Sequence, residues 1–144
     1  MTAEALASLF PTMAQTGYAI TSPEDWRYNC IAWAVGDMRQ WWEPLRGSYW
    51  PPGVPREYTL AAYTRVFAIH GYVSCDNAEL EPGFEKVALF TNEEGAPTHA
   101  ARQLASGIWA SKLGELEDIE HTTLHALEGA AYGKVAQVMK RARR

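Results

Sequence analysis

Two thiols, Cys30 and Cys75, are the groups in this sequence best suited to covalent chemistry. Cys30 follows Asn29 at the start of a segment with helical character. A helix N-terminus supplies partial positive charge and free N–H groups, which lower the pKa of a thiol and can stabilise an oxyanion on an attacked carbonyl. We therefore predict that Cys30 is a nucleophile. The alternative is that Cys30 is a small buried core residue, since free cysteines are among the most buried residue types.

A thiol nucleophile needs a base within hydrogen-bond reach, and the sequence contains four histidines. We select His99, because it opens the strand-like run 98–104 and because its same-face neighbours, Ala101 and Gln103, leave room for a substrate. His70 ends a helical segment before a glycine, where an imidazole interacts favourably with the helix dipole. Cys75 lies in a turn-rich stretch, so we interpret both Cys75 and His70 as structural.

His121 and His125 are four residues apart, a spacing that places two imidazoles on one helix face and suits two ligands of one metal. No third ligand is evident from the spacing, and no Glu follows His121 in the manner of a zinc-binding helix. We therefore predict no metal and no cofactor. A metal-dependent hydrolase using these two histidines is our third hypothesis.

A third polar residue is expected to hold the ring of the catalytic histidine in one orientation. If residues 105–107 form a three-residue hairpin loop, Ser111 lies on the same sheet face as His99, one diagonal step away. A two-residue loop would reverse this face. Gln103 shares the His99 face under either register, and Asp118 in the acidic segment 115–120 is the charged alternative.

Six tryptophans are many for this length, and four of them lie within eighteen positions, at Trp33, Trp41, Trp42 and Trp50. Residues 40–56 contain many prolines and glycines and no clear period, which indicates a long loop. Aromatic side chains beside a thiol can line a substrate pocket. They can also bind a partner, so the rival hypothesis is a non-catalytic protein-binding module that uses the Trp-rich loop 41–50. The predicted substrate-binding residues are Asn29, Trp33, Trp41, Trp42 and Gln103.

The elements that would position these residues change character along the chain. Apolar spacing predicts a short helix near residues 6–13, a turn of helix at 22–25, a helix over 29–36 capped by Asn29, and a helix over 60–70. The runs 87–91, 98–104 and 108–113 predict an antiparallel meander. Apolar residues at helical spacing from 124 to 138 predict a C-terminal helix. Helices, then sheet, then a helix indicate an α+β fold.

The composition limits the class of protein. A chain of 144 residues that is 47% hydrophobic can bury a core without metals or disulfides, and we expect a single domain over 1–144. A net charge of −4 argues against nucleic acid as a partner. The sequence has no apolar run long enough for a membrane span and no secretory signal at its start, so we expect no membrane association and a cytoplasmic location. Specialised secretion and the oligomeric state stay open.

Residues 28–34 around Cys30, residues 98–100 around His99, and Ser111 together resemble the nucleophile helix, base and third polar residue of the papain-like fold, closest in size to the bacterial NlpC-type peptidases. The segments 97–104 and 109–114 are also similar to small bacterial proteins of unassigned activity. The resemblance implies N-terminal helices packed on a small antiparallel sheet in one papain-like domain. It also implies thiol-dependent cleavage of a peptide or protein amide, by hydrolysis, deamidation or transamidation.

Overall fold

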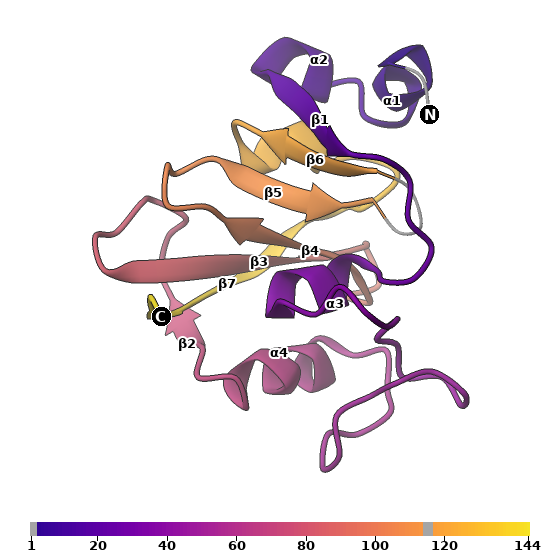
Figure 1. Ribbon diagram of the computed structural model, residues 1–144, viewed down its shortest axis with the longest axis vertical. Coiled ribbons are helices and arrows are strands. Elements are labelled where there is room, and N and C mark those ends of the chain that lie inside the picture. The colour runs from indigo at the N-terminus through magenta and orange to yellow at the C-terminus, as the bar shows by residue number, and fades with distance from the viewer. Residues whose placement is uncertain (1–2, 114–116) are drawn as a thin grey trace.

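The computed structural model, described here for residues 3–113 and 117–144, is an α+β fold built on one seven-stranded antiparallel sheet (Figure 1). The order of the strands across the sheet is β1-β6-β5-β4-β3-β7-β2. Strands β4, β5 and β6 are therefore consecutive neighbours in the sheet as well as in the sequence. The strands are β1 (Tyr18–Ser22), β2 (Val73–Cys75), β3 (Phe84–Thr91), β4 (Pro97–Gln103), β5 (Trp109–Lys112), β6 (Asp118–His121) and β7 (Lys134–Ala142).

The helices pack against both faces of the sheet, in two separate groups. Side chains of α3 and α4 pack against Val87 and Leu89 of β3, whereas α1, α2 and the 3-10 helix η1 contribute to a second cluster with Ala88 and Phe90. Successive residues of a strand point to opposite faces, so this central strand is buried on both sides. The helices are α1 (Ala3–Leu9), α2 (Met13–Thr16), α3 (Cys30–Val35), α4 (Leu60–Ala68) and η1 (Leu124–Leu127).

The predicted helices around residues 29–36 and 60–70 and the predicted β-meander are confirmed. The predicted register of the β4–β5 hairpin is confirmed as well, because Arg102 pairs with Ala110 and the N–H of Leu104 donates to the carbonyl of Ile108 at 2.8 Å. Gly107 has φ of +92°, as a three-residue loop of this type requires. Within the described residues, no helix is long and apolar enough to cross a membrane.

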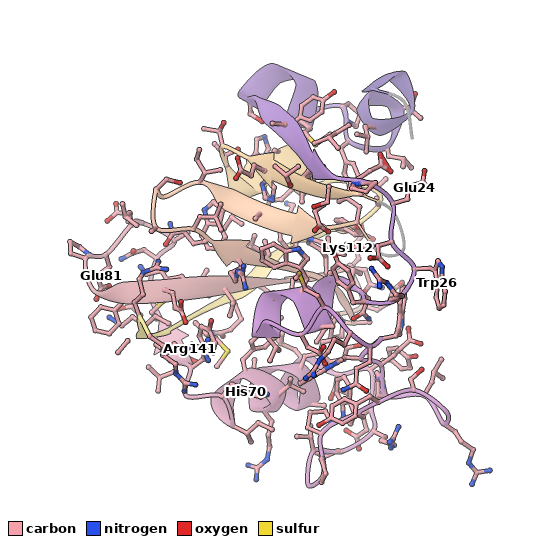
Figure 2. All side chains as sticks on the ribbon, in the orientation of Figure 1. Glu24, Trp26, His70, Glu81, Lys112 and Arg141 are labelled. Atoms are coloured by element: carbon pink, nitrogen blue, oxygen red, sulfur yellow. The ribbon has the colours of Figure 1, made fainter. Side chains whose placement is uncertain are left out.

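Residues 23–29 between β1 and α3, here called the strap, have no regular secondary structure in place of the predicted turn of helix. Lys112, labelled in Figure 2, reaches from β5 and donates to the carbonyl of Asp25 at 2.6 Å. The Tyr28 hydroxyl donates to Asp118 Oδ2 on β6 at 2.8 Å. These contacts with two strands hold the strap against the sheet, and they outweigh the local preference of the Ser-Pro-Glu-Asp sequence for a helix start.

The predicted C-terminal helix is wrong, since residues 118–142 form β6, η1 and β7. Two glycines interrupt the helical pattern. Gly129 and Gly133 exchange backbone hydrogen bonds of 2.9 and 2.7 Å, and both have positive φ, which favours glycine. A Cβ on Gly133 would lie 1.9 Å from the carbonyl oxygen of Thr91, so only glycine fits this close approach.

Strand β7 pairs with both β3 and β2, which accounts for the basic residues near the C-terminus. Arg141 Nε donates to Glu85 Oε1 at 2.5 Å, and Lys140 Nζ donates to Glu81 Oε2 at 2.8 Å. Figure 2 labels Arg141 and Glu81 in this part of the sheet. These two cations thus pair with carboxylates along the sheet.

Candidate active site

Asn29 fixes both the start of α3 and the loop beside it. Its Oδ1 accepts from the backbone N–H of Ala32 at 3.1 Å, which makes it the N-cap, and also from the N–H of Trp42 at 3.2 Å. Its Nδ2 donates to the carbonyl of Trp42 at 2.7 Å. At the other end of the helix, Gly36 has φ of +107°. One buried side chain therefore sets the position of Cys30, the first helical residue, relative to the Trp-rich loop.

Cys30 contacts β4 at residues that precede the part of β4 paired with β5. The paired residues are Arg102–Ala110 and Gln103–Trp109, and the N–H of Ala100, further toward the start of β4, interacts with the Cys30 sulfur. Burial raises the pKa of the thiol to about 11, although the backbone N–H groups of Ala100, Ile31 and Cys30 itself act in the opposite direction. The predicted low thiol pKa is therefore wrong in direction, because the sulfur is buried.

His99 is held from three sides and is almost completely buried. Its ring stacks on Tyr132 with the centroids 4.2 Å apart and the planes 6° apart, and Phe90 approaches it edge-on. Nε2 lies 2.9 Å from Ser111 Oγ, whereas Nδ1 is buried and has no hydrogen-bond partner in the described structure. Burial, followed by the electrostatic effect of His121, lowers the pKa of His99 well below its usual value.

The hydrogen bonds continue beyond Ser111. Its Oγ lies 2.8 Å from Nε2 of His121, and Nδ1 of His121 lies 2.9 Å from the backbone carbonyl oxygen of Thr123. Trp109 pairs with His121 in the sheet, so His121 is one diagonal step from Ser111, as Ser111 is from His99. Burial lowers the pKa of His121 to about 4.

Cys30 and His99 line one cavity of about 180 Å³, although no hydrogen bond between them is present among the described contacts. Four aromatic side chains form much of its wall, and Glu43 supplies a carboxylate. A wider hollow of about 880 Å³ lies elsewhere, beside the β3–β4 turn, and contains neither Cys30 nor His99. The aromatic residues of the smaller cavity are Trp41, Tyr58, Tyr63 and Tyr132, and its other lining residues are Asn29, Ile31, Pro97 and Thr98.

Two of the five predicted substrate-binding residues, Asn29 and Trp41, line this cavity. Trp42 is buried and its Nε1 donates to Asp37 Oδ2 at 2.8 Å, so it serves the packing of its own loop. Trp42 is therefore not part of the cavity wall as the structure describes it.

Trp33 and Gln103 also lie away from the cavity. The Trp33 ring packs under the guanidinium of Arg102, with 3.7 Å between the guanidinium carbon and the ring centroid. Gln103 Nε2 donates to the carbonyl of Ala78 at 3.1 Å, near the opposite end of β4 from His99. Four residues along a strand span about 13 Å, too far for Gln103 to orient the His99 ring.

Asp118, the charged alternative for the third residue, accepts the hydroxyl of Tyr28 and supports the strap before α3. Residues 115 and 116 of the acidic segment lie outside the described part of the chain. Of the three candidates for the third residue, Ser111 is the one whose side chain meets His99.

The two histidines proposed as a metal pair lie in different secondary-structure elements and have different hydrogen-bond partners. His121 is buried at the end of β6, whereas His125 lies in η1 and its Nδ1 is 3.0 Å from Glu128 Oε1. The described residues contain no group of three or more His, Cys, Asp or Glu side chains that could hold a metal ion.

Sequence reasoning missed several residues around the site, namely Glu43, Tyr58, Tyr63, Tyr132 and His121. The incorrect C-terminal helix includes Tyr132, and His121 was considered only as a metal ligand, so neither residue was expected beside His99. The glycines on both sides of residues 130–132 were the available signal for a turn that could carry Tyr132 over the sheet.

The fold and the site define an α+β protein with a buried thiol and a buried imidazole at one cavity. Residues 19–140 match a family described as a domain of unknown function (DUF7689), and the chain belongs to that family. A search of curated proteins and a search of solved structures gave no match.

Proposed function

We propose that this protein is a thiol-dependent amidohydrolase in which Cys30 is the nucleophile, His99 the general base and acid, and Ser111 the residue that orients the imidazole. One observation carries the proposal. Nε2 of His99 is engaged by Ser111, and Nδ1 is left without a partner in a ring that shares a cavity with the Cys30 thiol. A buried nitrogen without a partner is costly in a purely structural residue, and it is what a base requires.

The chemistry follows from the groups at the cavity. His99 Nδ1 accepts the thiol proton as the Cys30 sulfur attacks the carbonyl carbon of a peptide or protein amide. The same proton then passes to the leaving nitrogen, which departs as an amine or ammonia and leaves an acyl-thioester. His99 next removes a proton from water, whose oxygen attacks the thioester and restores the thiol. An amine in place of water gives transamidation.

Burial determines the resting state of the pair. It disfavours both the thiolate of Cys30 and the imidazolium of His99, since each is a charged form in a buried site. The resting enzyme therefore holds a neutral thiol and a neutral imidazole, and the proton moves during attack. Backbone N–H groups of Cys30 and Ile31 that face the sulfur are available to the developing oxyanion.

The resemblance to papain-like peptidases of the NlpC type supports this proposal through the order of its parts. A cysteine begins a helix, a histidine lies near the start of a later strand, and a polar residue on the next strand meets the imidazole. The papain-like assignment and the amide substrate belong to this proposal.

The Trp-rich loop offers less to a rival binding function than its composition suggests. Trp50 is buried and its Nε1 donates to the carbonyl of Pro55 at 3.0 Å, and Trp42 is buried as well. Binding sites that depend on aromatic anchors present those rings to the partner. Trp41 faces the cavity, where it contributes to the proposed active site.

The test is acyl transfer from p-nitrophenyl acetate, which requires no knowledge of the natural substrate. We expect release of p-nitrophenolate together with an acetyl group on the Cys30 peptide, detected by mass spectrometry. His99→Gln is expected to slow acylation by about 100-fold, the usual contribution of a positioned base. Cys75→Ser is the matched control and is expected to have no effect. The proposal is wrong if Cys30 is not acylated, or if His99→Gln acylates as fast as the wild type.

A further inference from the structure

We infer that His121 is a positioning residue that selects the tautomer of His99 through the hydroxyl of Ser111. This inference deepens the proposed function and rests on it for its catalytic meaning. The three side chains come from three consecutive strands, β4, β5 and β6, and are joined by contacts of 2.9 and 2.8 Å. All three are buried, so water does not compete for these hydrogen bonds.

The donor and the acceptor of each hydrogen bond between His99, Ser111 and His121 follow from the contact that His121 makes with the backbone. Nδ1 of His121 lies 2.9 Å from the carbonyl oxygen of Thr123, and a carbonyl only accepts, so Nδ1 carries the proton. His121 is neutral, because its ring is buried and no carboxylate contacts it among the described residues. Its Nε2 therefore has a lone pair and accepts the hydroxyl proton of Ser111.

The remaining step concerns Ser111 and His99. The single hydroxyl proton of Ser111 is directed to His121, so the oxygen of Ser111 can only accept from His99. Nε2 of His99 is then the protonated nitrogen, and Nδ1 keeps its lone pair in a ring that lines the same cavity as Cys30. Without His121, the hydroxyl could donate to Nε2 and move the proton of His99 to Nδ1, the nitrogen that has to act as the base.

The experiment reads the tautomer directly, by long-range proton–nitrogen NMR of histidine-labelled protein at pH 7. Wild-type His99 is expected to have a protonated Nε2 and an unprotonated Nδ1, and His121 the reverse. In His121→Phe, which cannot accept a hydrogen bond, we expect the Nδ1-protonated form of His99 to appear. His121→Gln, whose amide oxygen can accept from Ser111, is expected to restore the wild-type pattern. His125→Gln, which removes an exposed histidine that takes no part in these hydrogen bonds, is the matched control.

A wild-type His99 protonated at Nδ1 would overturn the inference, even if no variant folds. An unchanged His99 tautomer in folded His121→Phe would overturn it as well. Acylation of Cys30 gives a second readout, with a loss of about tenfold expected in His121→Phe and recovery in His121→Gln. The tautomer pattern can be as expected although Cys30 is never acylated, in which case the proposed function fails and the positioning role of His121 stands.

A second and independent observation concerns the charge of the cavity. We infer that the site favours substrates with a cationic group next to the reacting amide, which again rests on the proposed function. Glu43 is the carboxylate at the cavity, and no Lys or Arg lines it among the described residues. Trp41, Tyr58 and Tyr63 line the same cavity, and the side chain of Tyr58 is hydrogen-bonded to Glu43. A carboxylate together with aromatic faces attracts a cation and repels an anion.

Methanethiosulfonate reagents test this preference on Cys30 without any enzymatic turnover. We expect the cationic aminoethyl reagent to modify Cys30 faster than the anionic sulfonatoethyl reagent, with the neutral methyl reagent as the reference. Glu43→Gln is expected to reduce the cation-to-anion rate ratio at least about fivefold. Glu57→Gln, an exposed change outside the cavity, should preserve the ratio, and Cys75 serves as an internal reference thiol. An unchanged ratio in Glu43→Gln overturns the inference.

Discussion

Acidification should destabilise the folded protein through its two buried histidines, His99 and His121. Both imidazoles must be neutral in the hydrogen bonds that join them through Ser111. The pKa of His121 is about 4 in the folded protein, against about 6.5 in an unfolded chain. As the pH falls through 6.5, His121 binds a proton in the unfolded chain, whereas it stays unprotonated in the folded protein. The stability contribution is therefore complete above pH 6.5 and is lost as the pH falls toward 4.

The size of the effect follows from the shift in pKa. At about 1.4 kcal/mol per pKa unit, His121 accounts for about 3 kcal/mol in full, of which about 2 kcal/mol is lost between pH 7 and about pH 4.5. Burial also lowers the pKa of His99, so the stability lost at His99 on acidification adds to the stability lost at His121. A loss of this order is a large part of the stability of a typical domain.

Urea unfolding followed by tryptophan fluorescence, at pH 7 and at about pH 4.5, measures this difference. Carboxylates also titrate in this range, so the informative quantity is the comparison between variants. His125→Gln should show the same loss of stability on acidification as the wild type. His121→Gln should lose about 2 kcal/mol less, because the titrating imidazole is gone. An equal loss in the two variants would refute the view that His121 is buried and neutral.

Three further outcomes are expected. Alkylation of Cys30 by iodoacetamide should reach half its maximal rate near pH 11 in the folded protein, but near pH 8.5 in urea, measured by peptide mass spectrometry; half-maximal alkylation of the folded protein below pH 8 would contradict the burial argument. Tyr28→Phe should lower the free energy of unfolding by about 1–3 kcal/mol, since Asp118 loses a buried donor; a variant as stable as the wild type in urea would count against it. Gly133→Ala should destabilise the protein more than Gly95→Ala in thermal unfolding, because both have positive φ but only Gly133 meets a backbone carbonyl; equal losses would show that the close approach is not real.

The parts of the site that could be predicted from the sequence depend on local signals. Asn29 and Gly36 mark the two ends of α3, so the position of Cys30 at a helix start follows from residues within about two helical turns. The loop that ends with Gly107 determines the register of β4 and β5, and this register brings Ser111 to His99. Both features depend on residues that are close together in the sequence.

The features that were predicted wrongly depend on contacts between distant residues. Leu124, Val135 and Val138 fit a helical period, but pairing of residues 134–142 with β3 and β2 decides in favour of a strand. The pKa of Cys30 depends on how deeply α3 is buried against the sheet, which the helix-start argument does not include. The role of His121 requires the location of β6, a strand that the sequence pattern did not indicate.

The diagonal arrangement of His99, Ser111 and His121 has a consequence for how sequences of this family can diverge. Each of the three side chains faces the same side of the sheet only because the connections between their strands have particular lengths. One residue added to the 105–107 loop would turn Ser111 to the other face of the sheet, although no residue of the site would be substituted. Among relatives that keep this hydrogen-bonded arrangement, the length of this loop should therefore be fixed, whereas the loop of residues 43–57 can gain or lose residues wherever they do not line the cavity.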